Sequence, residues 1–187
     1  IVALHGAKTL KISALGIDAD AHTEGHRFLA PGTVTISNAD QYESDLESKA
    51  KVVPSFNKRR AQIEAALLKA AGNDLVLMPD SLLDEVTSLV EWPAIYECHF
   101  DQEFLEVPQE CLILTMQTNQ KYFALTNKEG KLRNRFLIAS NIETNRPDAI
   151  ISGNERVVRP RLSDARFFFQ QDQKRPLGSR VADLGKV

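Results

Sequence analysis

The sequence has few cysteines and no long apolar run. Cys98 and Cys111 are its only cysteines, too few for a disulfide framework and not spaced as a Cys-x-x-Cys metal or redox site, which favours a reducing compartment. No apolar segment approaches the roughly 18 to 20 residues that cross a bilayer, and no secretory signal opens the chain. The chain begins with Ile1 instead of Met and leads directly into an expected strand. We therefore expect it to be part of a longer protein.

Common catalytic motifs are also missing. The sequence contains no Gly-x-x-x-x-Gly-Lys-Ser/Thr phosphate loop, no Gly-x-Gly-x-x-Gly dinucleotide fingerprint and no Gly-x-Ser-x-Gly nucleophile elbow. His22 and His26 are four residues apart, but the segment between them is typical of a loop and no third ligand is evident, so a metal site is not the preferred interpretation. Cys98 and His99 point to opposite faces of an expected strand, which favours a structural role for the cysteine.

Charge is unevenly distributed along the chain. The whole sequence has 23 Lys and Arg against 25 Asp and Glu, a net charge of −2. Residues 131–187 hold 12 basic and 6 acidic residues, whereas residues 1–130 hold 11 basic and 19 acidic ones, so the two parts carry +6 and −8. This asymmetry indicates an anionic partner for the basic part, although a neighbouring acidic domain would serve equally well.

Hydrophobic periodicity predicts a mixture of strands and helices. Alternating apolar residues between turn residues predict strands at 1–4, 9–15, 33–37, 94–100, 122–126 and 132–140. Helical spacing predicts helices at 40–51, 56–71, 81–90, from 108 through 116, and at 147–172. Ser81 and Asp84 resemble a capping box at the start of the third helix. The pattern predicts an α+β fold of mainly antiparallel strands and hairpins packed with several helices, including a long C-terminal helical segment.

The C-terminal helix carries the most informative surface. On a helical wheel Arg156, Arg159 and Arg166 share one face, and six apolar side chains lie on the opposite one: Val157, Val158, Leu162, Ala165, Phe168 and Phe169. Arg161 falls within the apolar arc, where burial would require a partner such as Asp164. Pro160 either kinks the helix or separates two helices. We expect Phe167, Phe168 and Phe169 to be core residues rather than bases' stacking partners.

The arginine face has two interpretations. Arginines that project from one side of a helix can hold phosphates with bidentate hydrogen bonds. The alternative is a solvated face with local ion pairs, such as Glu155 with Arg159 at the i,i+4 spacing.

Four segments resemble one known family. The run Gly153–Phe169 (GNERVVRPRLSDARFFF), preceded by Met116–Phe123 (MQTNQKYF), resembles the β subunit of the bacterial two-subunit glycyl-tRNA synthetases. Gly25–Phe28 (GHRF) and Val90–Pro93 (VEWP) resemble the same family. Because these segments are long and occur in the right order, the resemblance covers essentially the whole chain.

The resemblance implies a protein that ligates glycine to its tRNA in an ATP-dependent reaction, as the β subunit of a heterotetramer with a smaller α subunit. In that family the adenylate-forming site, with ATP and magnesium, belongs to the α subunit, and the β subunit supplies tRNA recognition. The resemblance thus implies a cytoplasmic, noncatalytic internal segment without a cofactor or a membrane contact. The implied partners are the α subunit, the tRNA for glycine and other β-subunit domains. We expect one module over 1–187, with a subdivision, if any, near 74–80 into 1–75 and 76–187.

Three hypotheses for the segment remain open. The first is a tRNA-contacting module, for which the basic C-terminal part and five arginines are the evidence: Arg133, Arg135, Arg156, Arg159 and Arg166. The second is a scaffold that docks the α subunit or other β-subunit domains. The third is a hydrolytic editing site, for which the sequence shows neither an activated nucleophile nor a metal cluster.

Overall fold

The computed structural model describes residues 1–185, so Lys186, which was counted in the basic part of the sequence, lies outside the described residues. The chain forms two compact units. Unit 1 comprises Ile1–Lys69, Pro79–Ile95 and Ala139–Asn145, and unit 2 comprises Ala70–Met78, Tyr96–Ile138 and Arg146–Val187. The expected subdivision near 74–80 stays a prediction. The mixture of helices and antiparallel strands confirms the α+β class.

Unit 1 begins with three short hairpins. They pair β1 (Leu4–His5) with β2 (Lys8–Thr9), β3 (Ser13–Ala14) with β4 (Ile17–Asp18), and β5 (His22–Glu24) with β6 (Thr33–Thr35). The single strand predicted at 9–15 is wrong, because the chain leaves β2 at Thr9 and turns at Leu15 and Gly16, both with positive φ. Leu10, Ile12 and Ala14 are exposed, so their apolar alternation does not mark a buried face.

Helices supply the buried part of unit 1. The segment predicted as one helix at 40–51 is three short turns, η1 (Ala39–Gln41), α1 (Tyr42–Asp45) and the π-type η2 (Leu46–Ala50). The helix α2 (Phe56–Ala71) has the predicted bounds, and α3 (Asp80–Leu89) nearly so. The buried apolar side chains come largely from these helices: Leu46, Ala50, Ile63, Leu67, Leu82, Leu83 and Val86.

One arginine links α2 to α3. Arg60 donates to Asp84 at 2.6 Å and to Asp80 at 2.7 Å. The predicted capping box at Ser81 and Asp84 is wrong: Pro79 precedes α3 without a side-chain cap, and Asp84 accepts from Arg60 instead.

Unit 2 is built on a four-stranded sheet in the order β7 (Leu75–Val76), β9 (Phe123–Thr126), β10 (Leu132–Ser140), β8 (Ala94–His99). The end residues Ala94–Ile95 and Ala139–Ser140 belong to unit 1. The predicted strand at 132–140 has the observed bounds, whereas β7 was not predicted. The hairpin between β9 and β10 turns at Gly130, which has a positive φ of 76°, as glycine readily allows.

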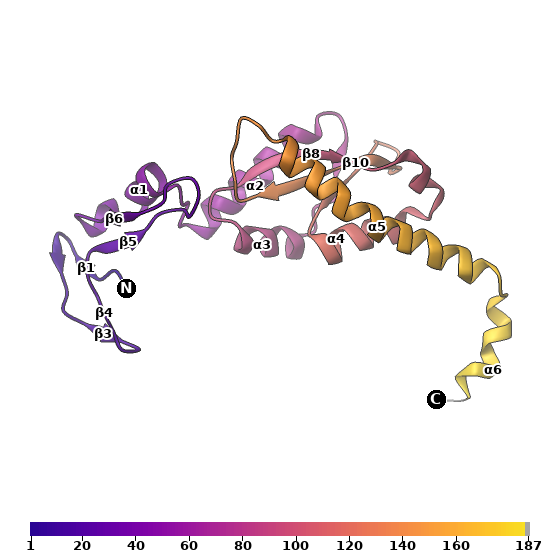
Figure 1. Ribbon diagram of the computed structural model, residues 1–187, viewed down its shortest axis with the longest axis horizontal. Coiled ribbons are helices and arrows are strands. Elements are labelled where there is room, and N and C mark those ends of the chain that lie inside the picture. The colour runs from indigo at the N-terminus through magenta and orange to yellow at the C-terminus, as the bar shows by residue number, and fades with distance from the viewer. Residues whose placement is uncertain (186–187) are drawn as a thin grey trace. The chain divides into compact units, whose positions relative to one another are not determined.

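Helices cover this sheet and complete its core. These helices are η3 (Gln102–Glu106), α4 (Gln109–Gln120) and α5 (Asp148–Gln173). The short helices η4 (Leu177–Arg180) and α6 (Val181–Leu184) follow α5 along the chain. Figure 1 shows α5 as one continuous helix, although Pro160 lies inside it. The core includes Phe104, Leu112, Met116, Phe136, Val158 and Leu162, each at most 2% exposed. No helix among residues 1–185 is long and apolar enough to cross a membrane.

Candidate nucleic-acid interface

The helix α5 continues through Pro160 because buried residues on both sides of the proline hold it against the core. Proline lacks an N–H, so the carbonyl of Arg156 has no i+4 donor at this point. Val158 and Leu162, which flank the proline, are fully buried in the core. Burying such side chains contributes roughly 1.5–3 kcal/mol each, which offsets the cost of about 3 kcal/mol for an internal proline. Of the two possibilities left open by the sequence, Pro160 therefore does not separate two helices but lies inside one.

Polar side chains fix the first half of α5 to the sheet. Glu155 Oε1 accepts a 2.8 Å hydrogen bond from the backbone N–H of His99. The hydroxyl of Tyr122 donates to Asn154 Oδ1 at 2.7 Å, and the Asn154 amide donates to the carbonyl of Ile150. These contacts set the rotation of α5 about its axis.

Two of the predicted arginines pair with the η3 segment. Arg159 contacts Asp101 at 2.5 Å, although its side chain is 64% exposed. Arg166 lies 3.3 Å from Glu103, and its guanidinium carbon lies 4.9 Å from the centroid of the Phe104 ring. Both arginines therefore have acidic partners in unit 2, where solvent weakens the pairing of Arg159 more than that of Arg166.

Arg156 differs from these two. Its side chain is exposed, and no residue among 1–185 forms a hydrogen bond or an ion pair with it. Arg161, which falls within the apolar arc of the helical wheel, is also exposed, so it needs no buried partner such as Asp164. The reason is that the buried stripe is narrow: it contains Val158 and Leu162, with Ala165 and Phe169 partly buried.

The predicted burial of the phenylalanines is only partly correct. Phe169 packs against the core, whereas Phe167 and Phe168 are 54% and 64% exposed. Their rings contact each other edge to face, with centroids 5.5 Å apart. Together with Arg156, Val157, Arg161 and Asp164 they form the solvent side of α5, which we call the α5 outer face.

The remaining two arginines lie on β10. Arg135 donates to Glu97 at 2.7 Å, to Asp74 at 3.2 Å and to the carbonyl of Ala71 at 2.7 Å. Arg133, half exposed, contacts the same Asp74 at 3.1 Å. Since Ala71 is the last residue of α2, Arg135 caps a helix C-terminus, where carbonyls otherwise lack donors.

One cysteine and one tyrosine of unit 2, Cys98 and Tyr122, are buried neutral groups. Burial raises the pKa of the Cys98 thiol to about 12, and the nearby carboxylates of Glu155 and Glu97 add to this shift. Burial likewise raises the pKa of Tyr122 to about 12, with a smaller contribution from Cys98. A thiol with such a pKa is protonated at neutral pH, which agrees with the structural role predicted for Cys98.

The two histidines considered as metal ligands have other partners. His22 Nδ1 lies 3.0 Å from the hydroxyl of Thr35. His26 is 1% exposed, and both of its ring nitrogens contact backbone groups. Among residues 1–185 no group of three or more His, Cys, Asp or Glu side chains is arranged to hold a metal ion.

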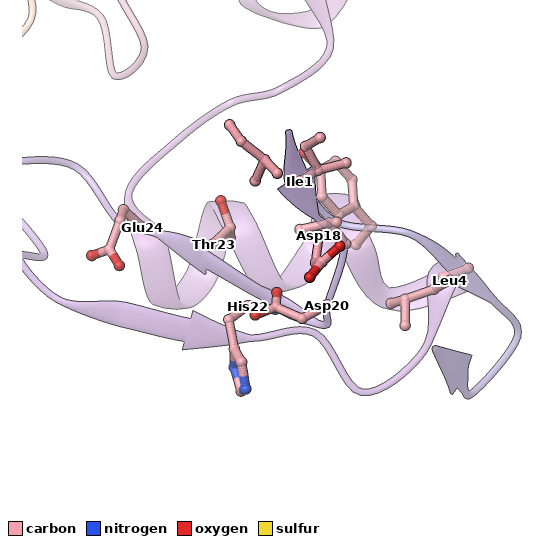
Figure 2. A pocket seen from close by; sticks show the side chains of 11 residues that line it. Ile1, Leu4, Asp18, Asp20, His22, Thr23 and Glu24 are labelled. Carbon is pink, nitrogen blue, oxygen red and sulfur yellow. The ribbon is translucent and has the colours of Figure 1, made fainter. Parts of the chain in front are cut away.

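A hollow with a volume of about 890 Å³ lies beside the N-terminal hairpins. Figure 2 shows Asp18, Asp20 and Glu24 around it, while the imidazole of His22 points away from Asp18. Asp20 accepts a hydrogen bond from the backbone N–H of His22, so this carboxylate already orders the start of β5.

We compared the sequence with known protein families and proteins. The profile of the family described as "Glycyl-tRNA synthetase beta subunit" matches residues 1–187. The chain belongs to the glycyl-tRNA synthetase β-subunit family. It is 57% identical over its whole length to the glycine–tRNA ligase β subunit of Ralstonia nicotianae and covers 27% of that protein. It is 53% identical to the one of Neisseria meningitidis serogroup C and 52% identical to the one of Polaromonas naphthalenivorans, covering 28% and 27% of them.

The chain thus spans about a quarter of the length of these glycyl-tRNA synthetase β subunits. Within this β-subunit segment the structure brings Arg133 and Arg135 together at Asp74. It places Arg159 and Arg166 against η3 and leaves Arg156 open. The assignment of all five arginines to tRNA binding stays a prediction.

Sequence reasoning missed two residues that organise the fold. Asp74 gathers the β10 arginines, and Asn141 accepts hydrogen bonds at Oδ1 from the backbone N–H groups of Glu91 and Trp92. Each is a single polar residue in a loop whose partners are at least 49 positions away. No local sequence pattern predicts contacts between residues so far apart in the chain.

Proposed function

We propose that this chain is a noncatalytic segment of the β subunit of a glycine–tRNA ligase, which attaches glycine to its tRNA in the cytoplasm in an ATP-dependent reaction. The observation that carries the proposal is the family match over all 187 residues. In this proposal ATP and magnesium bind the α subunit of the heterotetramer, and the segment contributes tRNA contacts and structural support.

Within the segment, the α5 outer face contacts tRNA through Arg156. This arginine is the member of the predicted set whose guanidinium has no acidic partner among residues 1–185. A guanidinium matches the geometry of a phosphate with two parallel hydrogen bonds, and an unpaired one loses no ion pair on binding. Arg161 on the same face adds a second open positive charge.

The other four arginines contribute less directly. Arg159 and Arg166 would have to share or leave Asp101 and Glu103 to bind a phosphate. Arg135 would have to leave three acceptors, including the end of α2. We therefore rank Arg156 first and Arg135 last as tRNA contacts.

Charge reversal in the complete α and β enzyme tests this function. Arg156→Glu removes one phosphate contact, so we expect about a tenfold loss of affinity for the tRNA at physiological salt and a salt slope smaller by about one unit. Lys128→Glu is the control, because this lysine is also exposed in unit 2 and lies in the β9–β10 loop. Equal affinities and slopes for wild type and Arg156→Glu would contradict the contact.

A second candidate function is protein docking, and the exposure of Val157, Phe167 and Phe168 favours it. On this hypothesis the α5 outer face packs against the α subunit or another β-subunit domain. The double variant Phe167→Ser with Phe168→Ser would then change subunit assembly, measured by light scattering, and leave tRNA affinity unaltered. The tRNA-contact hypothesis predicts normal assembly.

A further inference from the structure

A second surface, in unit 1, is built around a buried histidine. The segment Gly25–Ala30, here called the His26 loop, lies in the connection between β5 and β6. Nδ1 of His26 faces the backbone N–H groups of Phe28 at 3.2 Å and Leu29 at 3.1 Å. Since both groups donate, Nδ1 is the acceptor, and Nε2 carries the proton that it donates to the carbonyl of Asn141 at 2.7 Å. The imidazole thus fixes the loop internally and ties it to the segment at Asn141.

Backbone contacts hold the same loop at both ends. The N–H of Gly25 donates to the carbonyl of Gly32 at 2.9 Å, and that of His26 donates to Ala50 at 2.7 Å. The N–H of Ala30 closes the loop on the carbonyl of His26 at 3.0 Å. A Cβ at position 25 would overlap the carbonyl oxygen of Ala30, so a glycine is required there.

This ordered loop presents two side chains to solvent. Phe28 is 69% exposed, and its ring centroid lies 6.3 Å from that of His26. Arg27 is exposed and forms no hydrogen bond or ion pair within residues 1–185. Both line a hollow of about 680 Å³, whose other lining residues include Glu91 and Asn141. This volume lies within the range of roughly 300–1,000 Å³ that is usual for small-molecule sites.

We propose that the His26 loop binds one unpaired nucleotide of RNA, with the base stacked on Phe28 and its phosphate held by Arg27. An aromatic face accepts any base, and an adjacent arginine neutralises the backbone. The carboxylates of Glu24 and Glu91, which also line the hollow, are acceptors for the amino group of a base. A purely apolar ligand fits less well, since charged side chains line the hollow together with Phe28. The inference rests on the proposed function, because the RNA is the tRNA of that function.

Affinity measurements with the complete α and β enzyme and the tRNA for glycine test the stacking. Phe28→Ala is expected to weaken binding roughly 5- to 100-fold with little change in salt slope, and Phe28→Trp to bind within about twofold of wild type. Arg27→Ala is expected to lower the salt slope by about one unit. Phe56→Ala is the control, because Phe56 is a partly exposed aromatic of the same unit that already lies beside Arg59. Wild-type affinity for Phe28→Ala would overturn the proposal.

Photocrosslinking identifies what meets the loop. With p-benzoylphenylalanine at position 28 of the complete enzyme, we expect an adduct to the tRNA that maps to an unpaired nucleotide. Adducts confined to protein, or to base-paired nucleotides, would overturn the proposal.

The two proposed tRNA contacts, at Arg156 and at the His26 loop, can be refuted separately. If Arg156→Glu weakens tRNA binding and Phe28→Ala does not, the nucleotide site is wrong and the proposed function stands. If Phe28→Ala weakens binding and Arg156→Glu does not, the α5 contact is wrong and the nucleotide site stands.

Discussion

Replacing Arg135 should destabilise unit 2 much more than replacing its neighbour Arg133. Arg135 is only about a quarter exposed and joins three acceptors, whereas Arg133 is half exposed and contacts Asp74 alone. Hydrogen bonds to charged groups contribute about 1.5–3 kcal/mol where they are buried, and exposed ion pairs about 0–1 kcal/mol. Allowing for solvent at Arg135, we expect a loss of about 2 kcal/mol for Arg135→Ala and at most about 0.5 kcal/mol for Arg133→Ala.

Thermal unfolding of the 187-residue chain, followed by far-ultraviolet circular dichroism, measures this difference. A change of 1 kcal/mol shifts the Tm of a chain of this size by about 2–4 °C, so Arg135→Ala should lower the Tm by about 4–8 °C. Arg133→Ala should lower it by less than about 2 °C. Arg135→Lys should recover only part of the loss, because an ammonium group lacks the planar fork that reaches several acceptors. Equal Tm values for the two alanine variants would refute the structural role of Arg135.

Three further predictions follow from the buried groups and the tight loop. Gly25→Ala should lower the stability of unit 1 by about 1–3 kcal/mol, because the added Cβ would overlap the carbonyl oxygen of Ala30. Urea unfolding of the 187-residue chain measures this loss, and a variant as stable as wild type would contradict the overlap. Under native conditions a thiol reagent should modify the exposed Cys111 and not the buried Cys98, and rapid modification of both would contradict the burial. Because the pKa of Tyr122 rises from 10.0 to about 12 on folding, the neutral form is favoured in the folded state, and its contribution is lost as the pH rises from 10 to 12. Stability should fall over this range, and less steeply in Tyr122→Phe; identical slopes would exclude the contribution.

Local patterns in the sequence were sufficient for the long elements. The helix at 56–71 and the strand at 132–140 were predicted with the observed bounds, because each is long and strongly periodic. The first two hairpins, β1–β2 and β3–β4, were not, since two-residue strands have too few positions to show alternation. Leu10, Ile12 and Ala14 alternate as core residues do but are exposed.

Predictions from the helical wheel failed where the width of the buried stripe mattered. A wheel shows that Val158, Leu162, Phe168 and Arg161 lie on one side of α5, but not how far the neighbouring elements wrap around it. The structure buries only the centre of that side and leaves Arg161 and Phe168 in solvent.

The candidate site depended on contacts that are distant in sequence. Nothing near Arg135 or Arg159 in the sequence reveals their pairing with Asp74 and Asp101, which lie 61 and 58 positions away. Composition identified the basic C-terminal part, and only the fold separates arginines with partners from the open Arg156.

A cryo-EM map of the α and β subunits with bound tRNA would show directly whether the α5 outer face contacts the tRNA. We expect that it does, with the guanidinium of Arg156 within hydrogen-bond distance of a phosphate oxygen. An α5 outer face that is covered by protein, or open to solvent while tRNA is bound elsewhere, would contradict it.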